Sequence, residues 1–153
     1  MERRARTARL LLLMISSATV LGCSSEPSRY AATGTVTIDG APAPYVVVRF
    51  FPTDPDSLYG GSGPTDESGK FSIGQDGKNT GFPSGEYKVT FSQTLVKGKP
   101  TLAGGGGKKN SEETVPSERE AVADDYRDPR KTPITASIGS GGNNFAFDIK
   151  SKK

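Results

Sequence analysis

The residues that could do chemistry in this chain are few. It contains no histidine and one cysteine, Cys23. Without histidine, the chain lacks the usual general base at neutral pH, the commonest metal ligand and the partner that activates serine or cysteine nucleophiles. No GxSxG or SxxK motif occurs either. The sequence therefore predicts a protein that is not an enzyme, with no cofactor and with no catalytic or metal-binding residues.

Carboxylates are the remaining reactive groups, and they fall in three short clusters. The clusters are Asp54 with Asp56, Asp66 with Glu67, and Asp124 and Asp125 with Asp128. Brought together at one end of a fold, such oxygen ligands would suit calcium, although the spacing of an EF-hand loop is absent. We expect these residues to cap turns instead. A hydrolase that uses carboxylates alone is an alternative, but no pair of acids stands out for it.

The N-terminal residues have the layout of an export signal. Arg3, Arg4, Arg6 and Arg9 precede an apolar stretch over residues 10–21, which ends at Gly22 and Cys23. That stretch is about 12 residues long, whereas a bilayer span needs about 20. We therefore predict a signal peptide over residues 1–22, with cleavage between Gly22 and Cys23.

The residues Val20, Leu21, Gly22 and Cys23 resemble the lipobox of bacterial lipoproteins. The resemblance implies that the Cys23 thiol is diacylglycerated and that the new amino terminus receives a further fatty acyl group such as palmitate. Two or three acyl chains would hold the protein stably at a membrane. Membrane lipid, through acylated Cys23, is then the expected partner, and the bacterial cell envelope is the expected location. Ser24 and Ser25 favour the outer membrane or the periplasmic face. An ordinary secretory signal, with Cys23 near the cut by chance, is the alternative.

Removal of the leader changes the charge balance. The whole chain has 20 basic and 17 acidic residues, and the leader takes away four Arg and one Glu, which leaves 16 of each. A neutral mature protein lacks the basic footprint of a nucleic-acid binder, so no nucleic-acid partner is expected. Lysines gather over residues 97–109 and 150–153. We expect them to be solvated, and contact with anionic head groups is the alternative.

Beyond a short tether over residues 23–32, apolar residues alternate with polar ones in short runs bounded by Gly, Pro and Asp, which is typical of half-buried strands. The inward residues are expected to be Val36 and Ile38; Val46, Val48 and Phe50; Phe71 and Ile73; Tyr87, Val89 and Phe91; Ile134, Ala136 and Ile138; and Phe145, Phe147 and Ile149. Six apolar faces require two stacked sheets. The sequence predicts an all-β antiparallel sandwich over residues 33–150, followed by a basic tail at 151–153.

Other features qualify this fold. A capping-box spacing between Ser117 and Glu120 predicts one short helix that ends before Asp128. The outward residues Tyr45, Val47 and Phe51 beside Arg49 are more apolar than a solvated face needs, so we expect a loop to cover them. Two connections, residues 52–69 and 92–116, are long enough to be functional or disordered, and we expect local disorder first in the second.

Four segments carry a resemblance to a known domain family. They are GTVTIDGAP from Gly34, VVVRFFP from Val46, TDESGKF from Thr65 and PSGEYKV from Pro83. Together they resemble the transthyretin-like, carboxypeptidase-regulatory-like domain of exported bacterial proteins, over roughly residues 33–150. The resemblance implies about seven strands, the extra one near residues 53–65 or within the second long loop. Enzymes of related fold use histidines, which this chain lacks. The expectation is a non-enzymatic binding or structural module with an envelope protein or a glycan as partner. A carbohydrate- or peptide-binding accessory subunit that uses the 52–69 and 92–116 loops is the alternative.

Overall fold

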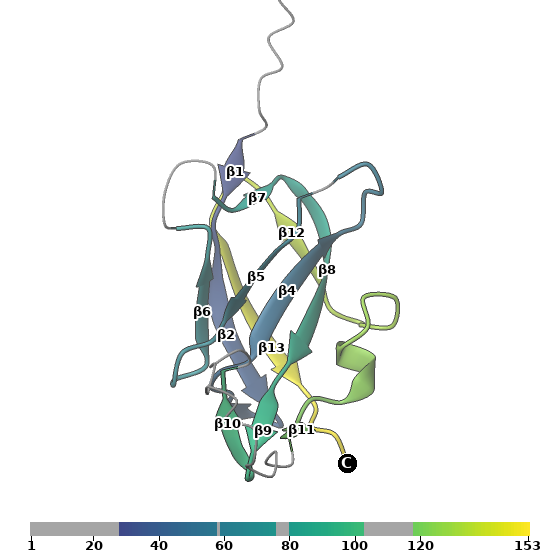
Figure 1. Cartoon of the computed structure of the whole chain (residues 1–153). Helices are drawn as coiled ribbons and strands as arrows, with labels where there is room; N and C mark the ends of the chain where they lie inside the picture. Colours follow the sequence, from purple (N-terminus) through teal and green to yellow (C-terminus); the bar gives the residue numbers. More distant parts are fainter. Residues whose placement is uncertain (1–27, 58, 76–79, 103–117) are drawn as a thin grey trace, which may run out of the picture.

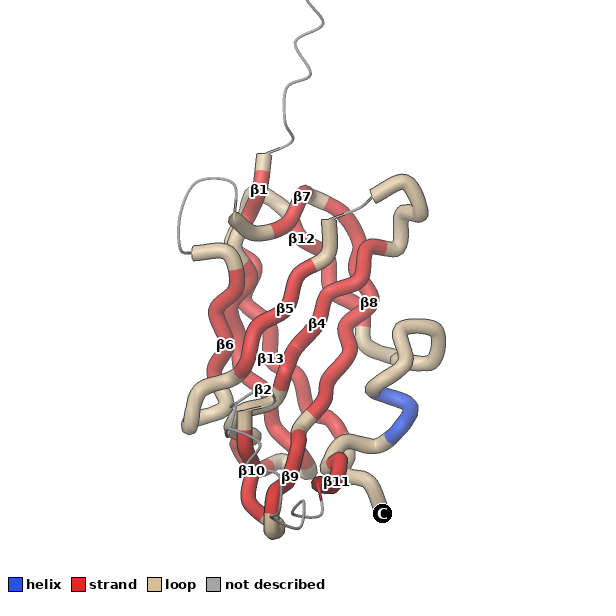
Figure 2. The backbone as a smooth tube through the Cα atoms, in the orientation of Figure 1, coloured by secondary structure: helices blue, strands red, loops and turns tan. Residues whose placement is uncertain are grey.

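The computed structural model describes residues 28–57, 59–75, 80–102 and 118–153. These residues form a sandwich of two β-sheets with one very short helix (Figures 1 and 2). The predicted fold class, an all-β sandwich, is confirmed. No helix in the described ranges has the length and hydropathy needed to cross a membrane.

The first sheet is built around β2 (Ala32–Ile38). On one side β2 pairs with β13 (Asn143–Ile149), and on the other it pairs with β3 (Ala41–Pro42) and β6 (Lys70–Ile73). The β2–β13 pairing is parallel, whereas every other strand pairing among the described residues is antiparallel. A parallel pair cannot be joined by a tight turn. Here the rest of the domain forms the connection.

The second sheet has the order β12 (Thr135–Ile138), β8 (Gly85–Ser92), β4 (Val47–Pro52) and β5 (Gly61–Pro64). Strand β5 falls within residues 53–65, where the resemblance implied a strand that the apolar pattern did not reveal. With β5, the two sheets contain seven strands of four or more residues.

Short strands mark the two ends of the sandwich. At one end, β1 (Arg29–Tyr30) pairs with β7 (Phe82–Pro83). At the other end, β9 (Thr94–Val96) pairs with both β10 (Lys99–Thr101) and β11 (Glu118–Glu120), and the C-terminus lies nearby (Figure 1). We call these the β1 end and the β9 end.

The predicted helix from Ser117 is wrong. Ser117 itself lies outside the described residues, and Glu118–Glu120 form strand β11. The only helix in the described chain is a single 3-10 turn, η1 (Asp124–Tyr126). The Glu120 carboxylate, expected to cap a helix, instead accepts hydrogen bonds from the Ser92 hydroxyl and the Gln93 backbone N–H, at 2.7 and 2.8 Å. Tertiary partners on β8 and just after it thus override the local capping pattern.

The core follows the predicted alternation. Most of the expected inward residues are buried, and Ile38, Ile134 and Phe145 pack against the core while partly exposed. Phe50 lies at its centre, where its ring contacts aromatic rings from both sheets at centroid distances of 4.9–6.2 Å. Of the outward apolar residues that we expected a loop to cover, Tyr45 and Val47 are half-buried, whereas Phe51 remains 36% exposed.

Candidate binding groove

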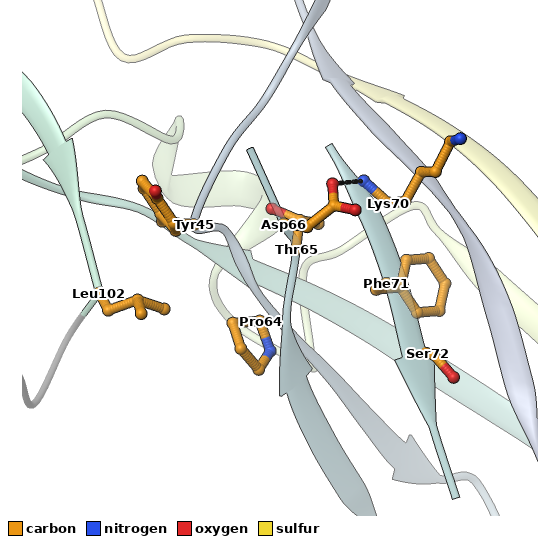
Figure 3. Close-up of a pocket in the computed structure, with 8 residues that line it drawn as sticks. All are labelled: Tyr45, Pro64, Thr65, Asp66, Lys70, Phe71, Ser72 and Leu102. Atoms are coloured by element: carbon orange, nitrogen blue, oxygen red, sulfur yellow. Dashed lines mark hydrogen bonds between the residues drawn. The ribbon is translucent and has the colours of Figure 1, made fainter. Parts of the chain in front are cut away.

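A groove of about 560 Å³ lies between β5 and β6, toward the β9 end. It is lined by Tyr45, Pro64, Thr65, Asp66, Lys70, Phe71, Ser72 and Leu102. In Figure 3, Tyr45 and Leu102 lie on one side, the end of β5 lies in the middle, and β6 forms the far wall. The groove therefore lies where edge strands of the two sheets meet.

Glycine in β5 allows this close approach. A Cβ atom at Gly63 would lie 2.9 Å from Cγ1 of Ile73 on β6, which is closer than side-chain contacts allow. A glycine-containing edge strand can therefore lie against the apolar face of β6, where a larger residue would push it away. Because two of the four residues of β5, Gly61 and Gly63, are glycines, the strand has no alternating apolar pattern in the sequence.

The floor of the groove is fixed by a buried hydroxyl. Thr65 is 2% exposed, and its Oγ1 donates to the Ala43 carbonyl oxygen at 2.7 Å while accepting from the Val46 N–H at 2.9 Å. These bonds tie the turn after β5 to the segment that enters β4. Because the hydroxyl is buried and both donates and accepts a bond inside the protein, Thr65 presents no exposed polar group to a ligand.

Asp66 forms the rim beside Thr65. Its Oδ1 accepts hydrogen bonds from the backbone N–H groups of Ser68 and Lys70 and from the Ser68 hydroxyl, at 2.8–2.9 Å. These bonds hold the pKa of Asp66 below its usual value, and the bond from the Lys70 N–H contributes most. As expected from the sequence, this carboxylate caps a turn.

Tyr45 has an unusual backbone conformation. Its φ is 57°, in the left-handed region that bulky residues rarely occupy. Two bonds hold it there: its N–H donates to the Thr65 carbonyl oxygen at 3.2 Å, and its hydroxyl donates to Glu67 Oε1 at 3.1 Å. The bond to Glu67 is the main cause that raises the pKa of the Tyr45 phenol. The side chain is thereby fixed at the wall of the groove.

These bonds determine what the groove can do. The polar atoms of Tyr45, Thr65 and the bonded oxygen of Asp66 are engaged with the protein itself. What faces the space is mainly the tyrosine ring, Pro64 and the exposed side chain of Leu102. Such a surface suits the apolar side chain of a peptide or the C–H face of a sugar ring. It provides contact area rather than a reactive constellation.

Strand addition to the free edge of β5 is disfavoured by Pro64. The Thr65 N–H bonds to the Val46 carbonyl, so by alternation along the ladder the backbone of Pro64 faces outward. Proline has no N–H to donate to an incoming strand. A ligand in the groove would therefore be held by side-chain contact.

Several predicted features lie outside the described residues. These are Gly22 and Cys23, with the cleavage and lipidation sites, and residues 103–116 of the second long loop. The three acidic clusters are not brought together: Asp54 borders a hollow beside Pro83 of β7, Asp66 borders the groove, and Asp124 lies in η1. Within the described residues, no three potential metal-ligating side chains group together.

The described lysines of the tail and of the β9–β10 hairpin gather at the β9 end. Lys150 pairs with Asp148 and Lys152 pairs with Asp124, each at 3.1 Å. Part of this positive charge is therefore balanced by neighbouring carboxylates, and the end is not a uniformly basic patch.

The two long connections meet only in part. Residues 53–57 lie at the β1 end, whereas β9 and β10 lie at the opposite end (Figure 1). The later part of the first connection, Pro64 to Asp66, does approach Leu102 from the second, and the groove is their meeting point. No motif in the sequence predicts Leu102 as a binding residue. An isolated leucine before a glycine run was the one available signal.

Comparison with known proteins does not identify a family for this chain. No protein-family model and no curated protein matches the sequence. Among solved structures, the chain is similar to the major pilin subunit of Bacillus cereus, with 14% identity and a TM-score of 0.43 over 83% of this chain and 31% of that one. It is also similar to a 9R-lipoxygenase from Cyanothece, with 14% identity and a TM-score of 0.34 over 82% and 17% of the two chains. The chain thus spans a third or less of either protein.

Proposed function

We propose that this protein is a lipid-anchored module of the bacterial cell envelope that acts by binding or as a structural part, and not as an enzyme. The observation that carries the proposal is the basic and apolar leader that ends at Gly22 and Cys23, followed by a strand-forming domain from Arg29 onward. Six residue steps separate Cys23 from Arg29, a reach of about 20 Å when extended. Acyl groups on Cys23 would hold the domain beside the lipid.

The test is metabolic labelling in a bacterial host with an alkyne fatty acid, using the wild-type chain and Cys23→Ser. We expect label in the wild-type protein, recovery of that protein with the membranes, and loss of both in Cys23→Ser. An unlabelled wild-type chain, or a serine variant that stays fully with the membranes, would contradict the anchor.

The proposal of a non-enzymatic role is supported by the composition and by the roles of the carboxylates. The whole chain lacks histidine. Asp66 caps a turn, as described above, and Asp128 does the same through bonds from the Arg130 N–H and guanidinium at 2.9–3.1 Å. Carboxylates engaged in this way stabilise turns and are poorly placed to transfer protons.

A second candidate function is recognition of a carbohydrate or peptide through the groove. It is favoured by the meeting of Pro64 and Leu102, one from each long connection, with Tyr45 around one apolar surface. The strained backbone of Tyr45 supports it further, since such strain is concentrated at functional positions.

Glycan and peptide arrays probed with the wild-type chain, Leu102→Ser and Phe51→Ser test this candidate. Leu102 and Phe51 are similarly exposed, at 44% and 36%, but only Leu102 lines the groove. We expect Leu102→Ser to weaken binding about tenfold, as the loss of one apolar contact implies, and Phe51→Ser to leave it unchanged. Equal losses in both variants would contradict groove recognition.

A further inference from the structure

We infer that the β1 end of the sandwich lies on the lipid surface, with Tyr59 in the head-group region, and that Leu102 at the groove lies farther from the lipid. The inference rests on the proposed acylation of Cys23. It adds an orientation and a contact residue, which acylation alone does not specify.

The first support is the place where the chain enters the domain. Strand β1 pairs with β7, with Arg29 opposite Pro83, so the first described strand is fixed at this end. The span from Cys23 to Arg29 reaches about 20 Å at most. Strand β2 alone has seven residues and is about 23 Å long. The β1 end is therefore within reach of the lipid, while the β9 end lies a full strand length farther along the domain (Figure 1).

The second support is the chemistry of the β1 end. Tyr59 is 40% exposed and borders a hollow of about 270 Å³ together with Pro52 and Pro83. The guanidinium carbon of Arg29 lies 4.2 Å from the centroid of the Tyr59 ring. Tyrosine is enriched at the membrane–water interface, where its ring meets apolar groups and its hydroxyl meets water.

The charges at this end indicate the kind of contact. Arg29 is accompanied there by the exposed acidic residues Asp54, Asp56 and Glu86. A surface with these carboxylates is not drawn to anionic lipid by its net charge. The contact should therefore rest on the aromatic ring and the tether, and it should form on zwitterionic phosphatidylcholine.

The absence of tryptophan from the chain makes this contact measurable. The mature acylated protein, which begins at Cys23, is reconstituted into phosphatidylcholine vesicles that contain acyl chains brominated near the head group. Tyr59→Trp reports on the β1 end, and Leu102→Trp, at a site with 44% exposure, is the matched control at the groove. Should Tyr59→Trp not fold, as judged by circular dichroism, Asp56→Trp, at an exposed turn position three residues earlier, replaces it.

We expect the tryptophan at 59 or 56 to show blue-shifted emission and at least about twofold stronger quenching than that at 102. Equal quenching at both ends, or stronger quenching at 102, in protein that floats with the vesicles would overturn the inferred orientation and leave the anchor standing. Failure of the wild-type chain to float would instead reject the anchor, and the orientation with it.

Discussion

The hydroxyl of Thr65 donates to the carbonyl oxygen of Ala43 at 2.7 Å, although 22 residues separate them. The same oxygen accepts from the Val46 N–H, so one side chain joins the turn after β5 to the start of β4. This bond fixes the floor of the groove and closes the edge of the sandwich.

Thr65→Val should destabilise the fold by about 1–3 kcal/mol. Valine has nearly the same shape but leaves the Val46 N–H and one acceptor on Ala43 without their buried partner. Urea unfolding followed by circular dichroism measures the loss. Thr135→Val, at an exposed position on β12, is the control and should change stability little. A Thr65→Val variant as stable as the control would show that these bonds contribute nothing.

Gly34→Ala should destabilise the β2–β13 pairing by about 3 kcal/mol. A Cβ at this position would lie 2.2 Å from the Phe145 carbonyl oxygen, and a backbone atom cannot easily move aside. Thermal unfolding of Gly34→Ala against Gly139→Ala tests this, since nothing lies within 4 Å of a Cβ at Gly139. Similar melting temperatures for the two variants would contradict the predicted clash.

Glu120→Ala should destabilise the protein by about 1–3 kcal/mol. The Glu120 side chain is 17% exposed and accepts bonds from the Ser92 hydroxyl and from the N–H groups of Gln93 and Val122. Glu118→Ala, at an exposed position on the same strand, should cost much less. The midpoints of urea unfolding compare the two. If Glu118→Ala proved the more damaging change, the role assigned to Glu120 would be wrong.

Stability should fall as the pH drops from about 4 to about 2. Hydrogen bonds to Arg130 lower the pKa of Asp128 from 3.8 to about 2, and bonds to Lys152 and to Thr37 lower those of Asp124 and Asp148. A carboxyl whose pKa is depressed by folding stabilises the folded state above its unfolded pKa. That contribution disappears as the pH falls through its folded pKa.

Melting temperatures at pH 5, 4, 3 and 2 test this prediction. Asp128→Asn should have a smaller decrease between pH 4 and pH 2 than the wild-type protein. Asp125→Asn should keep the wild-type profile, because Asp125 has no hydrogen bond or ion pair within the described chain. Identical profiles for wild type and Asp128→Asn would contradict the assignment.

Much of the fold could be predicted because alternation is a local property. The buried residues Val48 and Phe50 of β4 are each followed by an exposed one, and this period appears directly in the chain. Strand β5 lacked this signal, because its glycines pack against Ile73 without apolar side chains of their own. The prediction of a helix from Ser117 is wrong because the Glu120 carboxylate accepts hydrogen bonds from Ser92 and Gln93 instead of capping a helix.

The sequence by itself determined the all-β class, the inward residues and the turn roles of acids such as Asp66, because these depend on neighbours a few positions away. It also supplies the leader and Cys23, on which the proposed anchor depends. Only the tertiary structure decided that β2 and β13 run parallel and that Pro64 meets Leu102 across the groove. It likewise brought Arg29 onto the ring of Tyr59. These contacts join residues distant in the chain, and no local pattern of side chains encodes which distant partner a surface will meet.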